Sequence, residues 1–446
     1  MNRPFTYPQA LEYIASTGRF GIKMGLDRTR ALLDAVGAPD RGMRGALVAG
    51  TNGKGSTCAV LASIMRTAGL RVAEMPKPHL VSYTERVVVD ARPISERMFA
   101  RAVTAMVAPI EAVTPAHGAP TEFEILTAMA LRFARNRRAD LLVCEVGMGG
   151  RLDATNVTNL GVKVITSIDL DHQRYLGDTI AQIAAEKAGI IAPGDIVIAG
   201  PLAGDARDVV EARCREMGAE LLLATRDFTV TSLLTSWEGT VLALEAAPGG
   251  WIRSLPRLAT SLLGPHQAQN AAVAAVAAQA IARRQQLDLT DTAIREGIAA
   301  TRWPGRLERF SGNPDVVIDG GHNPAAVSAV TQAIAALGTE VPPVLLFGAM
   351  ADKDLAGMVA LLPLNWAAVF TQVPEERAVP AAALLEVARG MGRDADEASP
   401  DLGTALQRAR ARAGQGGVVL VLGSLYLAGA VRALLVANPA IVEAWP

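Results

Sequence analysis

Short hydrophobic segments alternate with helical patterns along most of the chain. Runs such as ALVAG (46–50), LLVCEV (141–146) and VKVITSI (162–168) are continuously apolar, which is typical of strands covered on both faces of a sheet. The stretch after the first run places apolar residues at the i, i+3, i+4 spacing of a helix, and residues 123–134 and 179–190 are further predicted helices. This alternation predicts an α/β fold with a largely parallel sheet.

The second half of the chain predicts a separate, smaller α/β domain. Residues 226–262 have β-branched residues around a turn, and we expect antiparallel strands there at a sheet edge, followed by helices at 267–284 and 290–300. The segment TRWPGRLERF (301–310) then interrupts the pattern. Strand-like runs resume at 316–319, 344–348, 367–371 and 418–423. We therefore predict an N-terminal domain at 1–300, a linker at 301–310 and a C-terminal domain at 311–446.

Composition narrows the class of partner. The 446 residues are too many for one ordinary core, and half of them are hydrophobic. Lys+Arg is 43 against Asp+Glu 44, and only 4% of residues are aromatic, so neither nucleic acid nor an anionic membrane is expected as a partner. Residues 418–436 are mostly apolar, but the Gly423-Ser424 break and Arg432 favour a buried strand followed by a helix over a membrane span.

The cysteines and the N-terminal segment favour a cytoplasmic location. Cys58, Cys144 and Cys214 are odd in number and lie far apart, so we expect free thiols, largely buried, in a reducing compartment rather than a disulfide framework. The first residues, MNRPFTYPQALEYI, lack the apolar core of a secretory signal.

A glycine-rich segment between a predicted strand and a predicted helix is the clearest candidate for chemistry. It reads GTNGKGST, from Gly50 to Thr57. Glycines let backbone N–H groups approach phosphate oxygens, the helix N-terminus adds positive charge, and Lys54 would reach the β- and γ-phosphates of ATP. The strict P-loop pattern fails, because Gly55 follows the lysine and Val48 stands where the first glycine belongs. The alternative is a glycine-rich turn with an exposed lysine.

Ionisable residues follow several predicted strands. Glu145 ends one strand, Asp171 and His172 follow another, and Asp319 opens the segment DGGHNP in the second domain. Ligands of open α/β sheets bind beyond the carboxyl ends of the strands, and a carboxylate and an imidazole on neighbouring strand ends can share a Mg²⁺ ion with ATP phosphates and water. The alternatives are a helix cap or an ion pair with Arg151 for Glu145, and a hydrogen-bonded core histidine for His172.

Ten segments along the chain match one family in order and spacing. The GTNGKGS loop resembles the variant of the Mur ligase superfamily, and the chain resembles its folylpolyglutamate synthase and dihydrofolate synthase branch most closely. The matching segments are GLDRTRALL (25–33), PHLVSYTERV (78–87), TEFEILTA (121–128), EVGMGGRLDATN (145–156), LDHQRYLGDT (170–179), EKAGI (186–190), GPHQAQNA (264–271), WPGRLE (303–308), DGGHNP (319–324) and GSLYLAGAVR (423–432). The resemblance implies a P-loop domain with a mostly parallel sheet, of the Mur ligase central-domain type, and a smaller Rossmann-like C-terminal domain.

The resemblance also implies roles for individual residues. It implies that Glu145 and His172 bind magnesium, and that Lys187 forms a carbamate with carbon dioxide. The alternative for Lys187 is a charged pair with Glu186 on a solvated helix face. Phe123 and Asp153 match positions that line the pterin site, although Phe123 is nearly as compatible with a core position. The residues implied to contact ATP are Thr51, Asn52, Gly53, Lys54, Gly55, Ser56, Asn270, Arg306 and Asp319.

One position departs from the family pattern. The family usually has a serine directly before PHL, and its hydroxyl serves a magnesium ion, whereas this chain has Lys77 there. A protonated ammonium has three donors and no lone pair, so it cannot bind a metal. Lys77 either substitutes its charge for a metal at the γ-phosphate or leaves the ion with fewer protein ligands; an exposed loop lysine is the third possibility.

The function implied by the resemblance is ATP-dependent ligation of L-glutamate to a folate carboxylate through an acyl phosphate. Lys54 would neutralise phosphate charge, His322 would orient the acyl phosphate or the amine, and Lys187 would act beside the magnesium ion. The substrates would be small molecules, and a monomer is expected. Three rival hypotheses are a Mur-type ligase for another acid, a P-loop kinase or GTPase, and a non-catalytic nucleotide-binding protein of the same fold. A P-loop kinase or GTPase would need a GK[ST] triplet and, for a GTPase, an NKxD segment, and this sequence contains neither.

Overall fold

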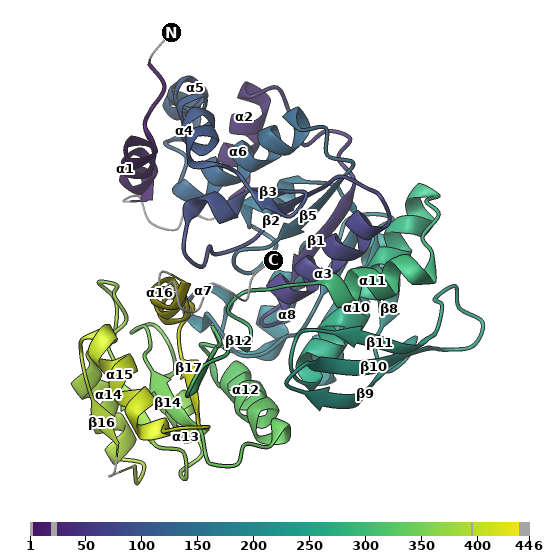
Figure 1. The fold of residues 1–446 in the computed structure, drawn as a ribbon. Coiled ribbons are helices and arrows are strands. Elements are labelled where there is room, and N and C mark those ends of the chain that lie inside the picture. The colour runs from purple at the N-terminus through teal and green to yellow at the C-terminus, as the bar shows by residue number, and fades with distance from the viewer. Residues whose placement is uncertain (1–2, 19–24, 394–395, 437–446) are drawn as a thin grey trace. The chain divides into compact units, whose positions relative to one another are not determined.

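The computed structural model describes residues 3–18, 25–393 and 396–436 (Figure 1). It divides into two compact units that are not continuous in sequence. The first unit takes the described residues of Met1–Ser232, Val241–Thr260 and Ala268–Thr301, and the second takes those of Leu233–Thr240, Ser261–Gln267 and Arg302–Pro446. The domain boundaries predicted at 300 and 310 stay a prediction.

An eight-stranded sheet forms the centre of the first unit. Its order is β4-β3-β2-β5-β1-β6-β7-β8, and the six strands from β2 to β8 in that order run parallel. The short strands β3 and β4 add antiparallel at one edge. The strands are β1 (Gly45–Ala49), β2 (Val72–Met75), β3 (Val88–Val89), β4 (Arg92–Pro93), β5 (Leu141–Glu145), β6 (Gly161–Ile165), β7 (Ile196–Ala199) and β8 (Glu220–Leu223). The largely parallel α/β sheet predicted from the apolar runs is therefore confirmed.

Helices lie on both sides of this sheet (Figure 1). Helix α3 packs against α11 so closely that a Cβ added at Gly297 would lie 2.4 Å from the Cα of Ile64, so a glycine is needed there. The helices of this part of the chain are α1 (Tyr7–Gly18), α2 (Asp27–Ala35), α3 (Lys54–Thr67), α4 (Glu96–Thr104), α5 (Val107–His117), α6 (Glu122–Asn136), α7 (Gln173–Leu176), α8 (Ile180–Ala188), α9 (Gly204–Met217), α10 (Pro265–Gln285) and α11 (Asp291–Ala300), with 3₁₀ turns η1 (Tyr83–Arg86) and η2 (Ala154–Val157).

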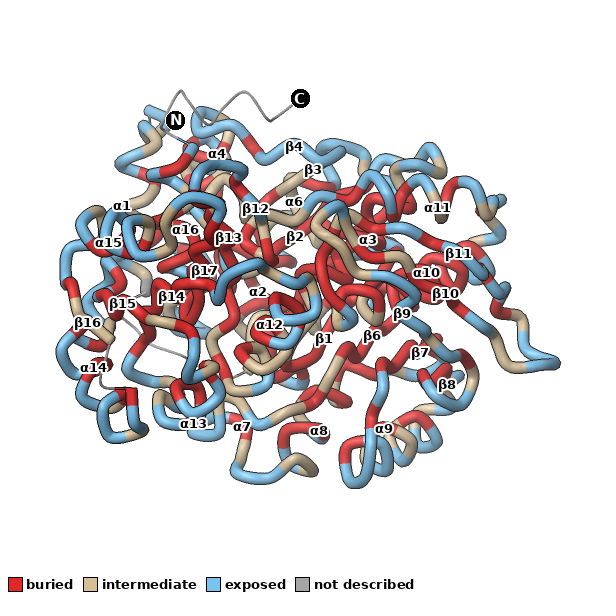
Figure 2. Tube along the Cα trace, turned by 60° about the horizontal axis from the view of Figure 1, so that its bottom comes forward, coloured by how far each residue is buried: buried red, intermediate tan, exposed pale blue. Residues whose placement is uncertain are grey.

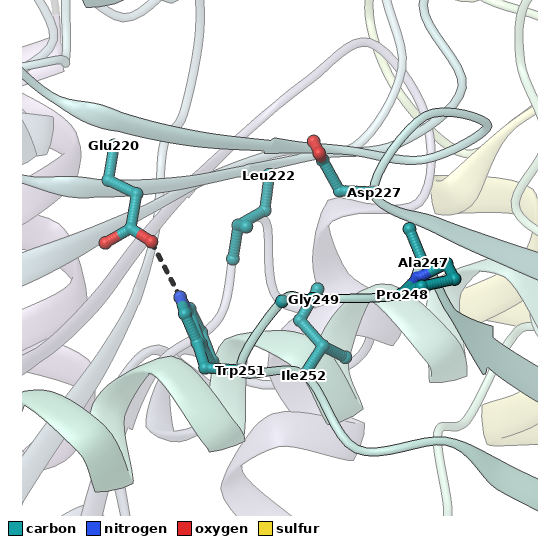
Figure 3. Close-up of a pocket in the computed structure, with 9 residues that line it drawn as sticks. Glu220, Leu222, Asp227, Ala247, Pro248, Gly249, Trp251 and Ile252 are labelled. Atoms are coloured by element: carbon teal, nitrogen blue, oxygen red, sulfur yellow. Dashed lines mark hydrogen bonds between the residues drawn. The ribbon is translucent and has the colours of Figure 1, made fainter.

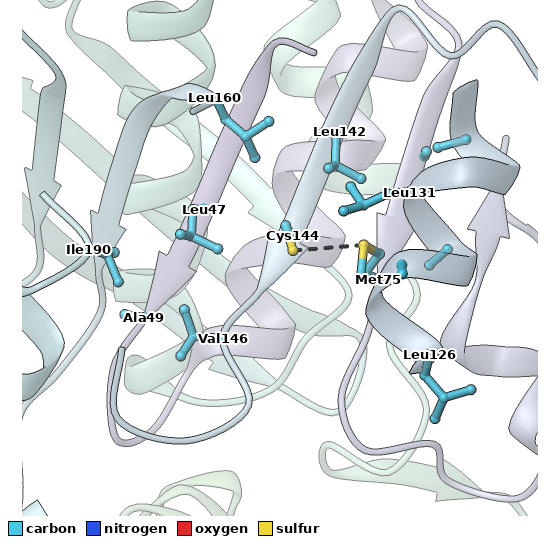
Figure 4. Close-up of a cluster of buried hydrophobic side chains, with 14 of the residues drawn as sticks. Leu47, Ala49, Met75, Leu126, Leu131, Leu142, Cys144, Val146, Leu160 and Ile190 are labelled. Atoms are coloured by element: carbon cyan, nitrogen blue, oxygen red, sulfur yellow. Dashed lines mark hydrogen bonds between the residues drawn. The ribbon is translucent and has the colours of Figure 1, made fainter. Parts of the chain in front are cut away.

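The core of the first unit is built from alternate residues of these strands. Leu47 and Cys144 face the same side of the sheet as Met75 and pack with Leu126 and Leu131 of α6 (Figure 4). Buried residues are concentrated along the strands (Figure 2). All three cysteines are buried and free, as predicted.

The second unit contains a six-stranded sheet of order β12-β13-β17-β14-β15-β16. Only β12 is antiparallel to its neighbour. Its strands are β12 (Glu308–Phe310), β13 (Asp315–Ile318), β14 (Val344–Phe347), β15 (Ala368–Phe370), β16 (Glu397–Ala398) and β17 (Val418–Leu422). Its helices are α12 (Pro324–Leu337), α13 (Leu355–Ala360), α14 (Ala381–Arg389), α15 (Leu402–Ala413) and α16 (Leu425–Val436). Residues 418–436 thus form a buried strand and a helix, as predicted. No helix within the described residues is long and apolar enough to cross a membrane.

One prediction about the fold is wrong. Residues 226–262 do form strands, but not at the edge of the main sheet. Strands β9 (Phe228–Ser236), β10 (Gly239–Ala246) and β11 (Leu255–Thr260) make a separate three-stranded sheet. The two-residue connection from β9 to β10 closes a hairpin, and this hairpin pairs with β11 rather than with β8.

Candidate active site

The glycine-rich loop connects β1 to α3, as a phosphate-binding loop does. Gly53 caps α3 with φ of 82°, a left-handed conformation that favours glycine. A Cβ at Gly53 would lie 2.3 Å from Oδ1 of Asn270. Asn270, in α10, therefore lies directly against the loop, so two of the residues expected to contact ATP are neighbours.

Two lysine side chains meet at the first residue of the loop. Lys54 Nζ donates to the carbonyls of Gly50 (2.9 Å) and Thr51 (3.0 Å). Lys187 Nζ, reaching from α8, donates to the same Gly50 carbonyl at 2.9 Å. Two ammonium groups at one carbonyl create local positive charge, which favours an anionic ligand such as a phosphate. Lys54 is not the exposed turn lysine of the alternative hypothesis, because it is half-buried and hydrogen-bonded.

Lys187 is buried, with a relative exposure of 4%. This contradicts the alternative that it belongs to a solvated face, and Glu186 instead pairs with Arg151 at 2.8 Å. Burial and, to a smaller extent, the charge of Lys54 lower the pKa of Lys187 to about 7, although the carboxylates of Asp171 and Asp169 oppose the shift. A substantial fraction of Lys187 is therefore a neutral amine near neutral pH, and the neutral amine is the form that reacts with carbon dioxide.

The segment after β6 supports the other side of the loop. Thr51 N donates to Ser167 O at 2.8 Å, and Asn52 N donates to Ser167 Oγ at 3.1 Å. Thr166 Oγ1 donates to Asn52 O at 2.6 Å. Thr166 and Ser167 were not predicted from the sequence, although their place directly after a strand was the available signal. They fix the conformation of the loop before any ligand arrives.

Of the two expected metal ligands, Glu145 lies on a strand that flanks β1 and His172 lies in the segment that follows the other flanking strand. Glu145 is the last residue of β5, is 3% exposed, and pairs in register with Val48 of β1. Its Oε2 accepts a hydrogen bond from Lys77 N at 3.1 Å, and Arg151 pairs with Glu186 rather than with Glu145.

His172 follows β6 on the other side of β1. It precedes α7 with φ of 52°, its Nε2 lies 3.9 Å from Asp171 Oδ1, and about a third of its side chain is exposed. It is therefore not a buried core histidine. Within residues 3–18, 25–393 and 396–436, no three His, Cys, Asp or Glu side chains converge to hold a metal by themselves. A carboxylate and an imidazole suit an ion whose remaining ligands are phosphate and water.

The residues expected at the pterin site lie together near β5. Asp153 is buried, and its oxygens accept from Gly147 N (2.9 Å) and Met148 N (3.0 Å) on one side and from the backbone and hydroxyl of Thr155 on the other. Phe123 is only half-buried, and its Cζ lies 2.8 Å from where a Cβ of Gly147 would stand. Any side chain at position 147 would therefore collide with the Phe123 ring, so a glycine is needed there.

Lys77 joins this group rather than standing exposed on the loop. Its Nζ lies 4.0 Å from the centroid of the Phe123 ring. The nitrogen is buried and has no hydrogen-bond partner. The alternative of a simple exposed lysine is therefore wrong.

The candidate residues of the second unit form their own cluster at the carboxyl end of β13. Asp319 is buried, and its oxygens accept from Leu307 N at 3.0 Å and Gly321 N at 2.7 Å. Burial raises the pKa of Asp319, while the charge of Arg306 opposes the shift. His322 Nδ1 lies 2.9 Å from Gly320 O. The segments WPGRLE and DGGHNP are thus tied together within this unit.

A surface cavity of about 490 Å³ lies elsewhere in the first unit. Glu220 and Trp251 face each other across it and share a 2.6 Å hydrogen bond (Figure 3). None of the predicted site residues lines this cavity, so its size does not make it the candidate for chemistry.

Comparison with known proteins identifies the family. The model of the Mur ligase middle domain matches residues 48–278, and that of the Mur ligase glutamate ligase domain matches residues 305–425. Folylpolyglutamate synthase of Lacticaseibacillus casei is 35% identical over 433 residues, covering 96% of this chain and 98% of that protein. The chain belongs to the folylpolyglutamate synthase and dihydrofolate synthase family.

Two further relatives of this family agree. Dihydrofolate synthase/folylpolyglutamate synthase of Bacillus subtilis is 33% identical, covering 96% of this chain and 98% of that protein. The Mycobacterium tuberculosis folylpolyglutamate synthase solved with ADP and AMPPCP superposes with a TM-score of 0.88 at 32% identity, covering 96% of this chain and 98% of that one. The two family models match different parts of this chain, residues 48–278 and residues 305–425. The candidate site residues likewise fall in two compact units.

Proposed function

We propose that this family member uses ATP to join L-glutamate to a carboxylate of a folate, as tetrahydrofolate, dihydropteroate or both. The observation that carries the proposal is the Gly50–Thr57 loop, whose backbone conformation and lysine side chains are set for a phosphate chain. The working form proposed is a cytoplasmic monomer, which light scattering of the purified chain would test.

The reaction has two steps. A carboxylate oxygen of the acceptor attacks the γ-phosphorus of ATP, the bond to the bridging oxygen breaks, and ADP leaves. The amine of glutamate then attacks the carbonyl carbon of the acyl phosphate, the C–O bond to phosphate breaks, and the amine loses a proton. The protein positions the reactants, offsets the charge of the oxyanions and excludes water, which would hydrolyse the acyl phosphate.

Residues of the first unit would hold the nucleotide and offset its charge. The backbone from Thr51 to Ser56 would cradle the phosphates, Lys54 would leave the Gly50 carbonyl to contact them, and Asn270 would contact the nucleotide beside Gly53. From the second unit, Arg306 and Asp319 would contact the nucleotide, and His322 would orient the acyl phosphate or the amine.

A divalent cation fits the donor set of the first unit. Glu145 at the end of β5 would supply an oxygen and His172, in the segment after β6, a nitrogen, and Mg²⁺ bound there would neutralise phosphate charge. Lys187 would carry a carbamate, formed when its neutral amine adds to carbon dioxide with loss of a proton. The carbamate would replace a cation by an anion beside Lys54 and the metal.

The decisive experiment supplies ATP and glutamate with dihydropteroate or tetrahydrofolate and measures glutamate-dependent release of ADP. Lys54→Ala and Glu145→Gln should each lower the rate by at least about 100-fold, because each removes charge stabilisation at the phosphates. Arg92→Ala removes an exposed cation from β4 and should leave the rate unchanged. Circular dichroism should find all three variants folded.

The acceptor decides between the remaining candidates. Product with dihydropteroate, with tetrahydrofolate or with both defines the activity. Wild-type turnover with neither, but with another carboxylic acid, would instead identify a Mur-type ligase for that acid. Normal turnover of Lys54→Ala would exclude the proposed role of the loop.

A further inference from the structure

The ammonium group of Lys77 is buried and has no hydrogen-bond partner. Lys77 follows β2, at the carboxyl edge of the sheet, and its Nζ lies 4.0 Å from the centroid of the Phe123 ring. An ammonium has three donors and no acceptor, and burying it without partners is unfavourable. Lys54 and Lys187 differ, because both donate to the Gly50 carbonyl. The hydrogen bonds of Lys77 are therefore left for a ligand.

The neighbouring carboxylate, Asp153, is fully hydrogen-bonded within the protein. Its Oδ2 and the Cζ of Phe123 lie 3.1 Å and 2.8 Å from the point where a Cβ of Gly147 would stand, so the carboxylate borders the ring. Burial lowers the pKa of the Lys77 ammonium, and the charge of Asp153 opposes that shift, yet no hydrogen bond joins the two. Each oxygen of Asp153 instead accepts two hydrogen bonds from residues 147–155. Its lone pairs are thereby used, so hydrogen bonding to a ligand at this point falls to Lys77.

The surroundings of Nζ indicate the kind of ligand. Phe123 and Asp153 are the residues expected at the heterocyclic end of the acceptor, whereas the reacting carboxylate belongs beside the phosphate loop. A cationic donor next to an aromatic ring suits a flat ligand that carries an acceptor on its rim. A ring carbonyl is such an acceptor, because its oxygen projects beyond the ring and has two lone pairs. The pterin of a folate or of dihydropteroate carries a carbonyl of this kind at position 4.

We propose that Lys77 donates a hydrogen bond to the ring carbonyl of the acceptor's heterocycle and so selects a 4-oxo heterocycle over a 4-amino one. This inference deepens the proposed function and rests on it. Replacing the carbonyl by an amino group exchanges an acceptor for a donor, which would leave the buried ammonium unsatisfied and set two donors against each other. Lys77 would thus determine specificity at the end of the acceptor that is remote from the reacting carboxylate.

The test measures binding by calorimetry with dihydropteroate, tetrahydrofolate and the 4-amino counterpart of each. The wild-type protein should bind the 4-oxo compound of a pair about 10- to 100-fold more tightly, the range expected for a hydrogen bond to a charged group. Lys77→Met should raise the dissociation constant of the 4-oxo compound by about the same factor. It should not weaken binding of the 4-amino compound, which makes no such bond in the wild type.

Controls separate this contact from others. Binding of a non-hydrolysable ATP analogue should be unchanged in Lys77→Met, and Arg92→Met, which removes an exposed cation from β4, should alter none of these values. Lys77→Met removes a buried charge that has no partner, so the variant should fold. Lys77→Gln, which keeps an N–H donor without the charge, should retain part of the preference for the 4-oxo compound and repeats the comparison independently.

Several results would overturn the inference. Equal affinity of the wild type for both members of a pair, or binding of neither, means that no group recognises the carbonyl. Equal weakening of both in Lys77→Met means that Lys77 only packs on Phe123, and tighter binding of both means that it competes with the heterocycle for the ring. Weakening of the ATP analogue alone assigns Lys77 to the phosphate. Failure of the proposed function looks different, because then the wild-type protein releases no ADP in response to glutamate, whichever heterocycle it binds.

Discussion

The two ends of the eight-stranded sheet treat buried lysines in opposite ways. Towards the amino end, Lys163 of β6 lies 3.8 Å from Asp195, the residue before β7, and both side chains are 1% exposed. At the carboxyl end, Lys187 donates to a backbone carbonyl and the Nζ of Lys77 has no partner. The charge of Lys163 is compensated by an ion pair, whereas carboxylates at the carboxyl end, Asp171 and Asp169 near Lys187 and Asp153 and Glu145 near Lys77, act on the two lysines through space.

This difference indicates which buried charges serve the stability of the fold and which are available to a ligand. Burial lowers the pKa of Lys163 and raises that of Asp195, and their mutual attraction opposes both shifts. Each member of this pair stabilises the charged form of the other, so the pair needs no ligand to compensate its charges. The carboxyl end instead presents lysine side chains where the phosphate loop begins, and an anionic ligand or a chemical modification there would offset their positive charge.

The largest effect on stability should come from breaking the pair. Asp195→Ala leaves the buried ammonium of Lys163 without its ion-pair partner. It should therefore lower the free energy of unfolding, measured by urea denaturation, by about 3–5 kcal/mol. Lys54→Ala should change it by no more than about 1 kcal/mol, because the side chain is half-buried and its loss leaves no buried charge behind.

The double variant Lys163→Met with Asp195→Leu provides the control, since replacing both ions by apolar groups should recover most of the loss. If Asp195→Ala were as stable as the wild type, the amino-end pair would not be the structural element described above.

A second effect should be seen at Lys187, as a carbamate whose amount depends on pH. With a pKa of about 7, the neutral amine should be about tenfold more abundant at pH 8 than at pH 6. Nuclear magnetic resonance with ¹³C-labelled carbon dioxide should therefore detect a carbamate at pH 8 that weakens at pH 6. Lys187→Arg should abolish the signal, because a guanidinium stays charged.

The same shift fixes the sign of the stability change. The folded pKa of Lys187 is lowered, so between about pH 7 and its usual value of 10.5 the unfolded chain binds more protons. Without carbon dioxide, the free energy of unfolding should rise with pH across that window, and Lys187→Met should flatten the rise. A carbamate signal that survives in Lys187→Arg would assign the modification to another amine.

Sequence patterns predicted the helices and strands better than they predicted which strands pair with one another. Continuous apolar runs and a glycine-rich turn are local signals, so β1, the loop and α3 could be predicted together. Strand pairing depends on residues far apart in the chain, and the pattern of 226–262 could not indicate that β9 to β11 form a sheet of their own.

Side-chain environments at the site were hidden for the same reason. Glu186 and Lys187 are adjacent in sequence, yet about 100° apart around α8, so Glu186 pairs with Arg151 while Lys187 is buried towards Gly50. The sequence marked Lys77 as a departure, but only the structure places its Nζ over Phe123.

The smallest effect should come from the ion pair that borders Lys187. Arg151 Nη2 lies 2.8 Å from Glu186 Oε1, with side-chain exposures of 56% and 18%, so water screens much of the attraction. Arg151→Gln should lower the free energy of unfolding by at most about 1 kcal/mol, and added salt should reduce the difference. The Lys187 carbamate should persist, because Lys187 is held by the Gly50 carbonyl and not by this pair. If Arg151→Gln lowered the free energy of unfolding as much as Asp195→Ala, solvent exposure would not explain the difference in strength between these two ion pairs. The contrast between the two ends of the sheet would then depend only on which end binds a ligand.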